Sequence, residues 1–279
     1  MSKVYIVTSY KGGVGKTTFS ANFAMSLAKR GHSVVAVDCD LESRCLDIVL
    51  GLENVTLFNV CDVIRGTCSL DNALVRDMRC ENLNFLSAPA FYPERHEIGG
   101  TADSFTRPAI EKFVKMLSDR FEYVIFDLPA RPDNLYRHLA CFADAAFVIS
   151  LHTAASIRAA EKTAIALNEL TGYGKDNLTS GGLEIKLIVN GFRARDVKNR
   201  DNIGLYDIIS KTHLQLGGVI PFDSAMSRAQ EKGKLACEVK SGKRLFYNAV
   251  ENITSRCEGH KVELFYGVDT GLRNNEQTY

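Results

Sequence analysis

Short apolar runs alternate along this chain with longer stretches in which apolar residues recur every three or four positions. Such runs are typical of strands buried on both faces, and the recurring stretches are typical of amphipathic helices. The short runs predict strands at residues 4–8, 33–38, 83–87, 123–127, 146–151, 185–190 and 218–220. The recurring stretches predict helices at residues 17–30, 57–65, 70–76, 108–120, 155–170, 203–211 and 243–257. This alternation predicts a single α/β domain, in which helices cover both faces of a mostly parallel, twisted sheet.

The size and composition of the chain agree with one domain. Its 279 residues are 46% hydrophobic, which is enough to bury a substantial core. We expect the domain at residues 1–258 and an appended tail at 259–279. The formal net charge is +1, so no overall field attracts nucleic acid or a membrane. The sequence shows no signal peptide and no apolar run of about 18 residues, which favours a cytoplasmic protein.

The eight cysteines do not form a recognisable metal motif. None belongs to a C-x-x-C pair or lies at metal-ligand spacing from histidines. In a reducing compartment they are expected to be free thiols or small buried hydrophobes. Cys39, which lies between two aspartates, is the one that we expect to be chemically sensitive.

A glycine-rich segment follows the first predicted strand and reads Lys11-Gly12-Gly13-Val14-Gly15-Lys16-Thr17-Thr18. Glycines allow backbone N–H groups to curl around an anion, and the predicted helix that follows adds its own unpaired N–H groups. A lysine and a threonine at the end of such a loop are placed to reach the terminal phosphates and to hold Mg²⁺. The segment therefore predicts a phosphate-binding loop.

Carboxylates end two of the predicted strands. Asp38 and Asp40 leave the strand at 33–38, and Asp127 ends the apolar strand at 123–127. Ligands of parallel α/β sheets bind beyond the carboxyl ends of the strands, so these groups are placed to touch Mg²⁺ or to orient an attacking water. For Asp38 and Asp40, capping of the following turn is the alternative that the sequence leaves open.

The loop departs from the common pattern G-x-x-x-x-G-K-[ST], because Lys11 stands beside the place of the first glycine. Together with Asp127-Leu128-Pro129-Ala130 and Gly218-Val219-Ile220-Pro221, the loop resembles the MinD/ParA family of deviant Walker A ATPases. The resemblance covers roughly residues 3–257 and is closest to the MinD branch. It implies a P-loop NTPase fold and an ATP-dependent homodimer, in which Lys11 reaches the nucleotide of the partner subunit. It also implies that Asp40 supports hydrolysis and that Asp38 belongs to the same switch segment.

The resemblance further implies which residues border the base. The sequence lacks the N-K-x-D or T-K-x-D motif of GTP-specific relatives, which favours ATP. Family members carry a strand-end Asn and a V-I-P-x-D segment beside the adenine, although the latter could also be a plain turn. The residues predicted to bind ATP are Gly12, Gly13, Val14, Gly15, Lys16, Thr17, Thr18, Asn190, Pro221 and Asp223. Lys11, Lys16 and Asp40 are the predicted catalytic residues, and Thr17, Asp38 and Asp127 the predicted Mg²⁺ ligands.

Arg131 stands where the switch segment of the family commonly has glycine. This departure puts in question how freely the segment moves. The arginine is placed to contact phosphate or a partner, and it fits a solvated loop residue equally well.

The resemblance predicts that the ATPase controls the positioning or partitioning of a partner, a cargo or DNA. Residues 186–244 hold twelve lysines and arginines against six acids, which leaves nonspecific DNA binding open. The tail at 261–279 holds two basic and three acidic residues, which disfavours an anionic membrane as the output. A MinD-type membrane regulator and a nitrogenase-type iron protein are the alternatives; Cys80 and Cys141 do not sit in the glycine-flanked settings of the iron proteins. A protein activator or cargo is the favoured partner.

Overall fold

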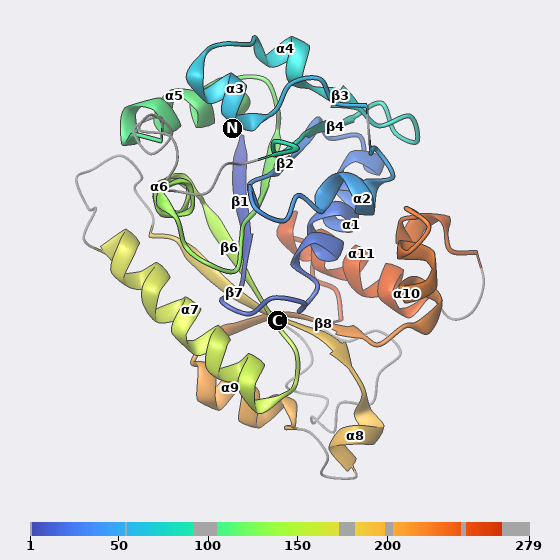
Figure 1. Cartoon of the computed structure of the whole chain (residues 1–279). Helices are drawn as coiled ribbons and strands as arrows, with labels where there is room; N and C mark the ends of the chain where they lie inside the picture. Colours follow the sequence, from blue (N-terminus) through green and yellow to red (C-terminus); the bar gives the residue numbers. More distant parts are fainter. Residues whose placement is uncertain are drawn as a thin grey trace.

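The computed structural model describes residues 2–53, 55–91, 105–172, 182–198, 203–240 and 244–263. These residues form one eight-stranded sheet in the order β3-β4-β2-β5-β1-β6-β7-β8 (Figure 1). All neighbouring strands are parallel except β3 and β4, which confirms the predicted fold class. The strands are β1 (Lys3–Thr8), β2 (Val34–Asp38), β3 (Val75–Arg76), β4 (Leu83–Leu86), β5 (Tyr123–Asp127), β6 (Ala145–Ser150), β7 (Glu184–Phe192) and β8 (Gln215–Pro221).

Helices cover both faces of the sheet (Figure 1). One face carries α3 (Val60–Arg65), α4 (Leu70–Ala73), α5 (Arg107–Ser118), α6 (Asn134–Phe142), α7 (Ala154–Gly172), α8 (Ala194–Lys198) and α9 (Leu205–Thr212). The other face carries α1 (Lys16–Lys29), α2 (Leu46–Leu50), α10 (Ser224–Gln230), the 3₁₀ turn η2 (Ala236–Glu238) and α11 (Leu245–Cys257). Among the described residues, no helix is both long and apolar enough to cross a bilayer.

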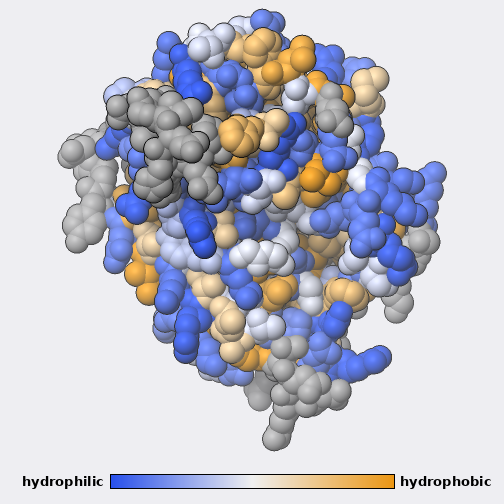
Figure 2. All heavy atoms as spheres, viewed as in Figure 1, coloured by the Kyte–Doolittle hydropathy of each residue, from blue (hydrophilic) through white to orange (hydrophobic). Residues whose placement is uncertain are grey.

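The surface in this view is mostly hydrophilic, with hydrophobic residues gathered around α4 and around α2 (Figure 2). Ile48 on α2 is 46% exposed, and Leu57, in the segment between α2 and α3, is 92% exposed. Single exposed apolar side chains are ordinary, but a group of them around one short helix is typical of a surface that meets a partner.

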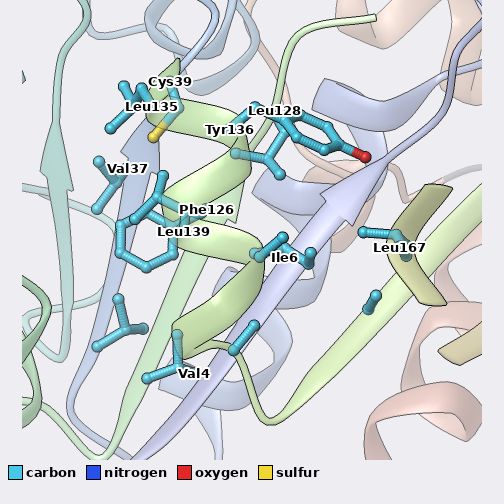
Figure 3. Packing of buried hydrophobic residues seen from close by; sticks show 14 of the residues in the cluster. Val4, Ile6, Val37, Cys39, Phe126, Leu128, Leu135, Tyr136, Leu139 and Leu167 are labelled. Atoms are coloured by element: carbon cyan, nitrogen blue, oxygen red, sulfur yellow. The ribbon is translucent and has the colours of Figure 1, made fainter. Parts of the chain in front are cut away.

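Two apolar clusters fill the space between the sheet and its helix layers. Along β1, Val4 and Ile6 face one cluster, whereas Tyr5 and Val7 face the other, because successive side chains of a strand point to opposite faces. Figure 3 shows the first cluster, where side chains of β1, β2 and β5 meet Leu135, Tyr136 and Leu139 of α6. Full burial of one such large apolar side chain contributes about 1.5–3 kcal/mol, so this double packing explains the continuous apolar runs of the strands.

The prediction of one helix over residues 70–76 is wrong at its end. Helix α4 stops at Ala73, and Val75 and Arg76 form the short antiparallel edge strand β3 beside β4. The backbone of Leu74 is already extended, with φ −74° and ψ 135°, and β-branched Val75 then pairs with Phe85. The edge of β4 thus gains backbone partners that the local sequence pattern could not reveal. The pattern also missed helices α2, α6, α8 and α10.

Candidate functional site at the carboxyl edge of the sheet

The glycine-rich segment connects β1, in the middle of the sheet, to the N-terminus of α1. Gly13 and Gly15 have φ values of +72° and +93°, a left-handed conformation that favours glycine. A Cβ at Gly12 or Gly13 would meet no described atom within 4 Å, so the backbone of the loop is open to a ligand. Gly15 caps α1 without a side-chain hydrogen bond, which leaves the first N–H groups of the helix available. This geometry fits a bound phosphate chain.

The two lysines of the loop lie in different environments. Lys16 is the first residue of α1 and is 8% exposed, so its side chain is largely shielded from solvent. Lys11 lies where the loop begins and is half-buried. Val14, between them, is buried and fixes the loop against the core. The structure thus separates an inner lysine from a lysine at the rim, and the catalytic roles of Lys16 and Lys11 stay predictions.

Asp127 lies beside the loop at the end of β5. Its Oδ1 accepts a hydrogen bond of 2.8 Å from the hydroxyl of Ser20. Burial raises the pKa of Asp127 to about 6, against the lowering effects of the Thr17 and Ser20 hydroxyls and the Lys16 charge. A carboxylate and a threonine hydroxyl beside a phosphate loop are the oxygen ligands that Mg²⁺ prefers, so these residues fit that cation. The Mg²⁺ role of Thr17 and Asp127 stays a prediction.

Ser20 is a site residue that the sequence reasoning missed. It is fully buried on α1, and its hydroxyl also lies 3.1 Å from the carbonyl oxygen of Lys16, one turn earlier. The sequence held no clear signal for it, because Thr17, Thr18 and Asn22 are polar residues of the same helical stretch.

Asp38 pairs with Asp127 in the register of β2 and β5 and is fully buried. Its two oxygens accept hydrogen bonds from the backbone N–H groups of Asp40 and Leu46, both at 3.0 Å. Burial raises the pKa of Asp38 well above its ordinary value, the charge of Asp127 adds to the effect, and the two N–H groups oppose it. Asp38 therefore organises the loop between β2 and α2.

Asp40 accepts a hydrogen bond of 3.0 Å from the N–H of Ser43 and is half-buried. For Asp38 and Asp40, the turn-capping alternative is what the described contacts show. Their predicted roles toward Mg²⁺ and hydrolysis stay predictions, and the two carboxylates do lie at the same sheet edge as the phosphate loop.

Asn190 lies against the loop. Its side-chain amide donates a hydrogen bond of 2.8 Å to the carbonyl oxygen of Val14, and its own oxygen accepts one of 2.9 Å from the N–H of Gly191. A Cβ on Gly15 would lie only 2.3 Å from Nδ2 of Asn190. Asn190 therefore supports the loop, a role that the sequence reasoning missed, and its contact with adenine stays a prediction.

The other two predicted base contacts lie at the end of β8. Pro221 is buried, and Asp223 caps α10 by accepting a hydrogen bond of 2.9 Å from the N–H of Ala225. Between them, Phe222 is 42% exposed, and the guanidinium of Arg193 lies 3.8 Å from the centre of its ring. The structure shows the turn that the sequence left as an alternative, and the roles of Pro221 and Asp223 toward adenine stay predictions.

Arg131 is exposed in the segment that follows β5, and its role stays a prediction. Cys39 is fully buried, and burial raises the pKa of its thiol well above the ordinary value. This shift opposes the thiolate chemistry that a sensitive cysteine needs. Cys80 packs on the cluster beneath α1, whereas Cys141 lies on α6, on the opposite face of the sheet.

A phosphate loop after the central strand, with a carboxylate at the end of the neighbouring strand, defines a nucleotide-binding protein of the P-loop class. Residues 5–236 match the model of the CobQ/CobB/MinD/ParA nucleotide binding domain, so the chain belongs to that family.

Its relatives include septum site-determining proteins MinD. The protein of Helicobacter pylori is 32% identical over 94% of this chain and 93% of the relative, and that of Bacillus subtilis is 31% identical over 95% and 92%. The solved MinC:MinD cell division protein complex of Aquifex aeolicus contains a chain with TM-score 0.76 and 27% identity, covering 95% of this chain and 99% of that one. These matches confirm the MinD/ParA resemblance and place the chain among the ATPases that regulate positioning, rather than among iron proteins.

Proposed function

We propose that this protein binds Mg²⁺ and ATP on the loop at residues 11–18, dimerises in the ATP-bound state and hydrolyses ATP slowly until a partner stimulates it. The observation that carries the proposal is the open glycine loop with buried Lys16 at its end and buried Asp127 beside it. The ATP state then controls where a partner or cargo is placed in the cytoplasm.

Each site residue has a stated part in this proposal. Lys16 and the N–H groups of residues 12–18 hold the phosphates, and Lys11 completes the site of the second subunit. Thr17 and Asp127 hold Mg²⁺, with Asp38 acting through water. When bound, Mg²⁺ neutralises charge on the phosphoryl group being transferred. Asp40 orients the attacking water, and the lysine from the second subunit adds positive charge only after dimerisation.

The proposed output is a protein. The MinD neighbour of known structure forms a complex with MinC, which supports a protein partner for a member of this family. Exposed Ile48 lies on α2, whose first residue is bonded to Asp38, and exposed Leu57 follows Thr56, which is bonded to Arg44 of the same loop. A change in that loop would therefore reach a surface suited to an apolar contact. DNA and membranes are the alternatives that the experiments below distinguish.

The two lysines give the direct test of this proposal. Lys16→Ala should lose nucleotide affinity in the monomer, because the phosphates lose their buried cation. Lys11→Ala should bind a fluorescent ATP analogue normally but fail to dimerise and to hydrolyse, as measured by light scattering and phosphate release. A Lys11→Ala protein that dimerises and turns over ATP like the wild type would contradict the proposal.

The proposed nucleotide preference is tested by competition on the wild-type protein. ATP should displace the analogue at a concentration about tenfold or more below that of GTP, which requires only ~1.4 kcal/mol of base discrimination. Equal displacement by the two nucleotides would remove the preference for ATP from the proposal.

A further inference from the structure

The segment that leads into Lys11 is bonded to side chains of two helices outside the phosphate loop, once through a side chain and once through its backbone. Thr8, the last residue of β1, shares a hydrogen bond of 2.9 Å with the hydroxyl of Tyr136 on α6. The N–H of Tyr10 donates a hydrogen bond of 3.0 Å to the hydroxyl oxygen of Thr163 on α7. Figure 3 shows the hydroxyl of Tyr136 beside the tip of β1. These two hydrogen bonds thus hold Thr8 and Tyr10, two of the three residues that precede Lys11.

Thr163 is placed for this contact rather than for packing alone. It is fully buried in α7, and its hydroxyl donates a bond of 2.7 Å to the carbonyl oxygen of Ala159, one turn earlier. A valine would occupy the same space without a polar atom, and such a back-bond by itself tends to weaken a helix. The hydroxyl of Thr163, oriented by its bond to Ala159, accepts a hydrogen bond from the N–H of Tyr10. Loss of this acceptor would leave that N–H without its hydrogen bond to Thr163.

Tyr136 holds the segment from the other side. It is fully buried on α6, which begins after Asp133 and so follows the switch segment that starts at Asp127. The rings of Tyr10 and Tyr136 lie 6.3 Å apart in a tilted contact. Because α6 packs on both β1 and α7, the two hydroxyls form one rigid support under the start of the loop.

The rest of the loop has a different support. Asn190 bonds to Val14, and Val14 and the first turn of α1 are buried in the cluster on the opposite face of the sheet. Loss of the Thr163 or Tyr136 hydroxyl should therefore disturb Lys11 and leave the phosphate cradle of residues 12–18 in place. The two lysines of the site are supported separately.

We propose that Thr163 and Tyr136 are positioning residues for Lys11: they fix the direction in which it leaves the loop, and so its reach toward the nucleotide of a second copy of this chain. This inference rests on the proposed function, because it assumes that Lys11 acts across a dimer. A lysine side chain has many rotamers and loses conformational entropy when it is ordered in a dimer. A fixed backbone at Lys11 reduces that entropy loss, because fewer torsion angles have to be ordered. Helix α7 thereby gains a link to catalysis without touching the nucleotide.

The first test is Thr163→Val, which removes the hydroxyl and keeps the shape. The turnover number at saturating ATP should fall about tenfold or more, as expected for a misplaced catalytic group. The affinity of the monomer for a fluorescent ATP analogue should stay within about twofold of the wild type. Thr163→Ser, which restores the hydroxyl, should recover most of the turnover.

Thr254→Val is the matched control. Thr254 is also fully buried in a helix and also bonds one turn back, to the carbonyl oxygen of Val250 at 2.9 Å, but it lies on α11, away from Lys11. Both valine variants lose the same kind of back-bond, and only Thr163→Val should lower turnover. Equal effects of the two variants would reduce Thr163 to a packing residue and overturn the inference.

Tyr136→Phe removes a single oxygen and carries the test if Thr163→Val does not fold. It should lower ATP-dependent dimerisation and turnover while nucleotide affinity stays near the wild-type value. If Tyr136→Phe and Thr163→Val dimerise and turn over ATP like the wild type while Lys11→Ala does not, the inference is wrong and the proposed function is unaffected. Wild-type behaviour of Lys11→Ala would instead remove the proposed function itself.

Discussion

Gly15 is the residue on which the shape of the phosphate loop depends most directly. It joins the loop to α1 with φ +93°, and its missing side chain leaves room for the amide of Asn190. Gly12 shows the contrast, since a Cβ there would meet no described atom and its φ is not positive. Gly15 is therefore required by its positive φ and by the neighbouring Asn190, whereas neither constraint acts on Gly12.

Gly15→Ala should lose nucleotide binding and lower the free energy of unfolding by about 1–2 kcal/mol, the cost of a left-handed conformation for an L residue. The added methyl group must also displace Asn190. Thermal unfolding and titration with a fluorescent ATP analogue check both effects. Gly12→Ala is the control and should unfold like the wild type, and a Gly12→Ala protein as unstable as Gly15→Ala would refute this account of the loop.

At the scale of elements, Arg79 joins three parts of the fold. Its Nε lies 2.9 Å from Oδ1 of buried Asp77, and its Nη1 lies 2.9 Å from Oε2 of Glu238, the last residue of η2. Its Nη2 donates a hydrogen bond of 2.6 Å to the carbonyl oxygen of Leu50 on α2. Burial of Asp77 is tolerated because this guanidinium pairs with it. The arginine thus connects the edge of the sheet to two helical segments.

Arg79→Ala should lower the free energy of unfolding by about 3–5 kcal/mol, because it leaves the buried carboxylate of Asp77 without its cation. Urea unfolding followed by circular dichroism measures the change. The matched control is Arg76→Ala on exposed β3, which should change stability by less than about 0.5 kcal/mol. If both alanine variants unfold at the same urea concentration, Arg79 does not hold these elements together.

A second element contact predicts how stability depends on pH. Glu258, directly after α11, accepts a hydrogen bond of 2.8 Å from Nε2 of His32, and Arg30 at the end of α1 pairs with the same carboxylate. Partial burial raises the pKa of Glu258, but the bonds and charges of His32 and Arg30 outweigh it and lower the pKa below its ordinary value. The folded state thus favours the ionised carboxylate.

Because the pKa of Glu258 is lower in the folded than in the unfolded chain, its contribution to stability is full above the unfolded pKa and is lost as pH falls through the folded value. Glu258→Gln should therefore flatten the loss of unfolding free energy on the acid side of about pH 4.5. Exposed Glu111 supplies the control, and Glu111→Gln should leave the acid slope unchanged. An unaltered slope in Glu258→Gln would show that this contact does not couple folding to pH.

Across the whole molecule, the loop between β2 and α2 connects the strand-end carboxylates to the surface. Asp38 holds the N–H of Leu46, the first residue of α2, and Arg44 bridges Asp47 and Thr56 at 2.7 and 3.1 Å. The strand-end carboxylates, α2 and the exposed apolar side chains around it therefore form one connected unit. A conformational change at the strand-end carboxylates can be transmitted to the surface through this unit.

Asp40→Ala should bind ATP, dimerise and remain dimeric, because the proposed water-orienting carboxylate is lost and the phosphate cradle stays. Light scattering over time checks the persistence of the dimer, and a dimer that decays as fast as the wild type would refute the role of Asp40. The trapped dimer also distinguishes the outputs. Salt-sensitive retardation of duplex DNA, reduced by charge reversal at Arg193 and Arg195, would identify a DNA surface. Sedimentation with anionic liposomes would contradict the expectation drawn from the tail.

The parallel sheet, the glycine-rich loop and the strand-end carboxylates could be predicted from the sequence. Each of these depends on short stretches: apolar runs for buried strands, glycines followed by Lys16 for the loop, and Asp127 at the end of one run. The resemblance to a known family added the predicted roles of Lys11 and Asp40. The local pattern failed at β3, because an edge strand depends on its neighbour more than on its own residues.

The distant residues that support the site became visible in the folded chain alone. Ser20 reaches Asp127, Asn190 reaches Val14, and Thr163 reaches Tyr10, across 107, 176 and 153 positions of the chain. A serine, an asparagine or a threonine in a helix or at a strand end has many possible partners, and nothing in its neighbourhood along the chain selects one. The packing of α1 and α7 on the sheet, and the position of β7 within it, make that selection, because polar groups removed from water need a hydrogen-bond partner.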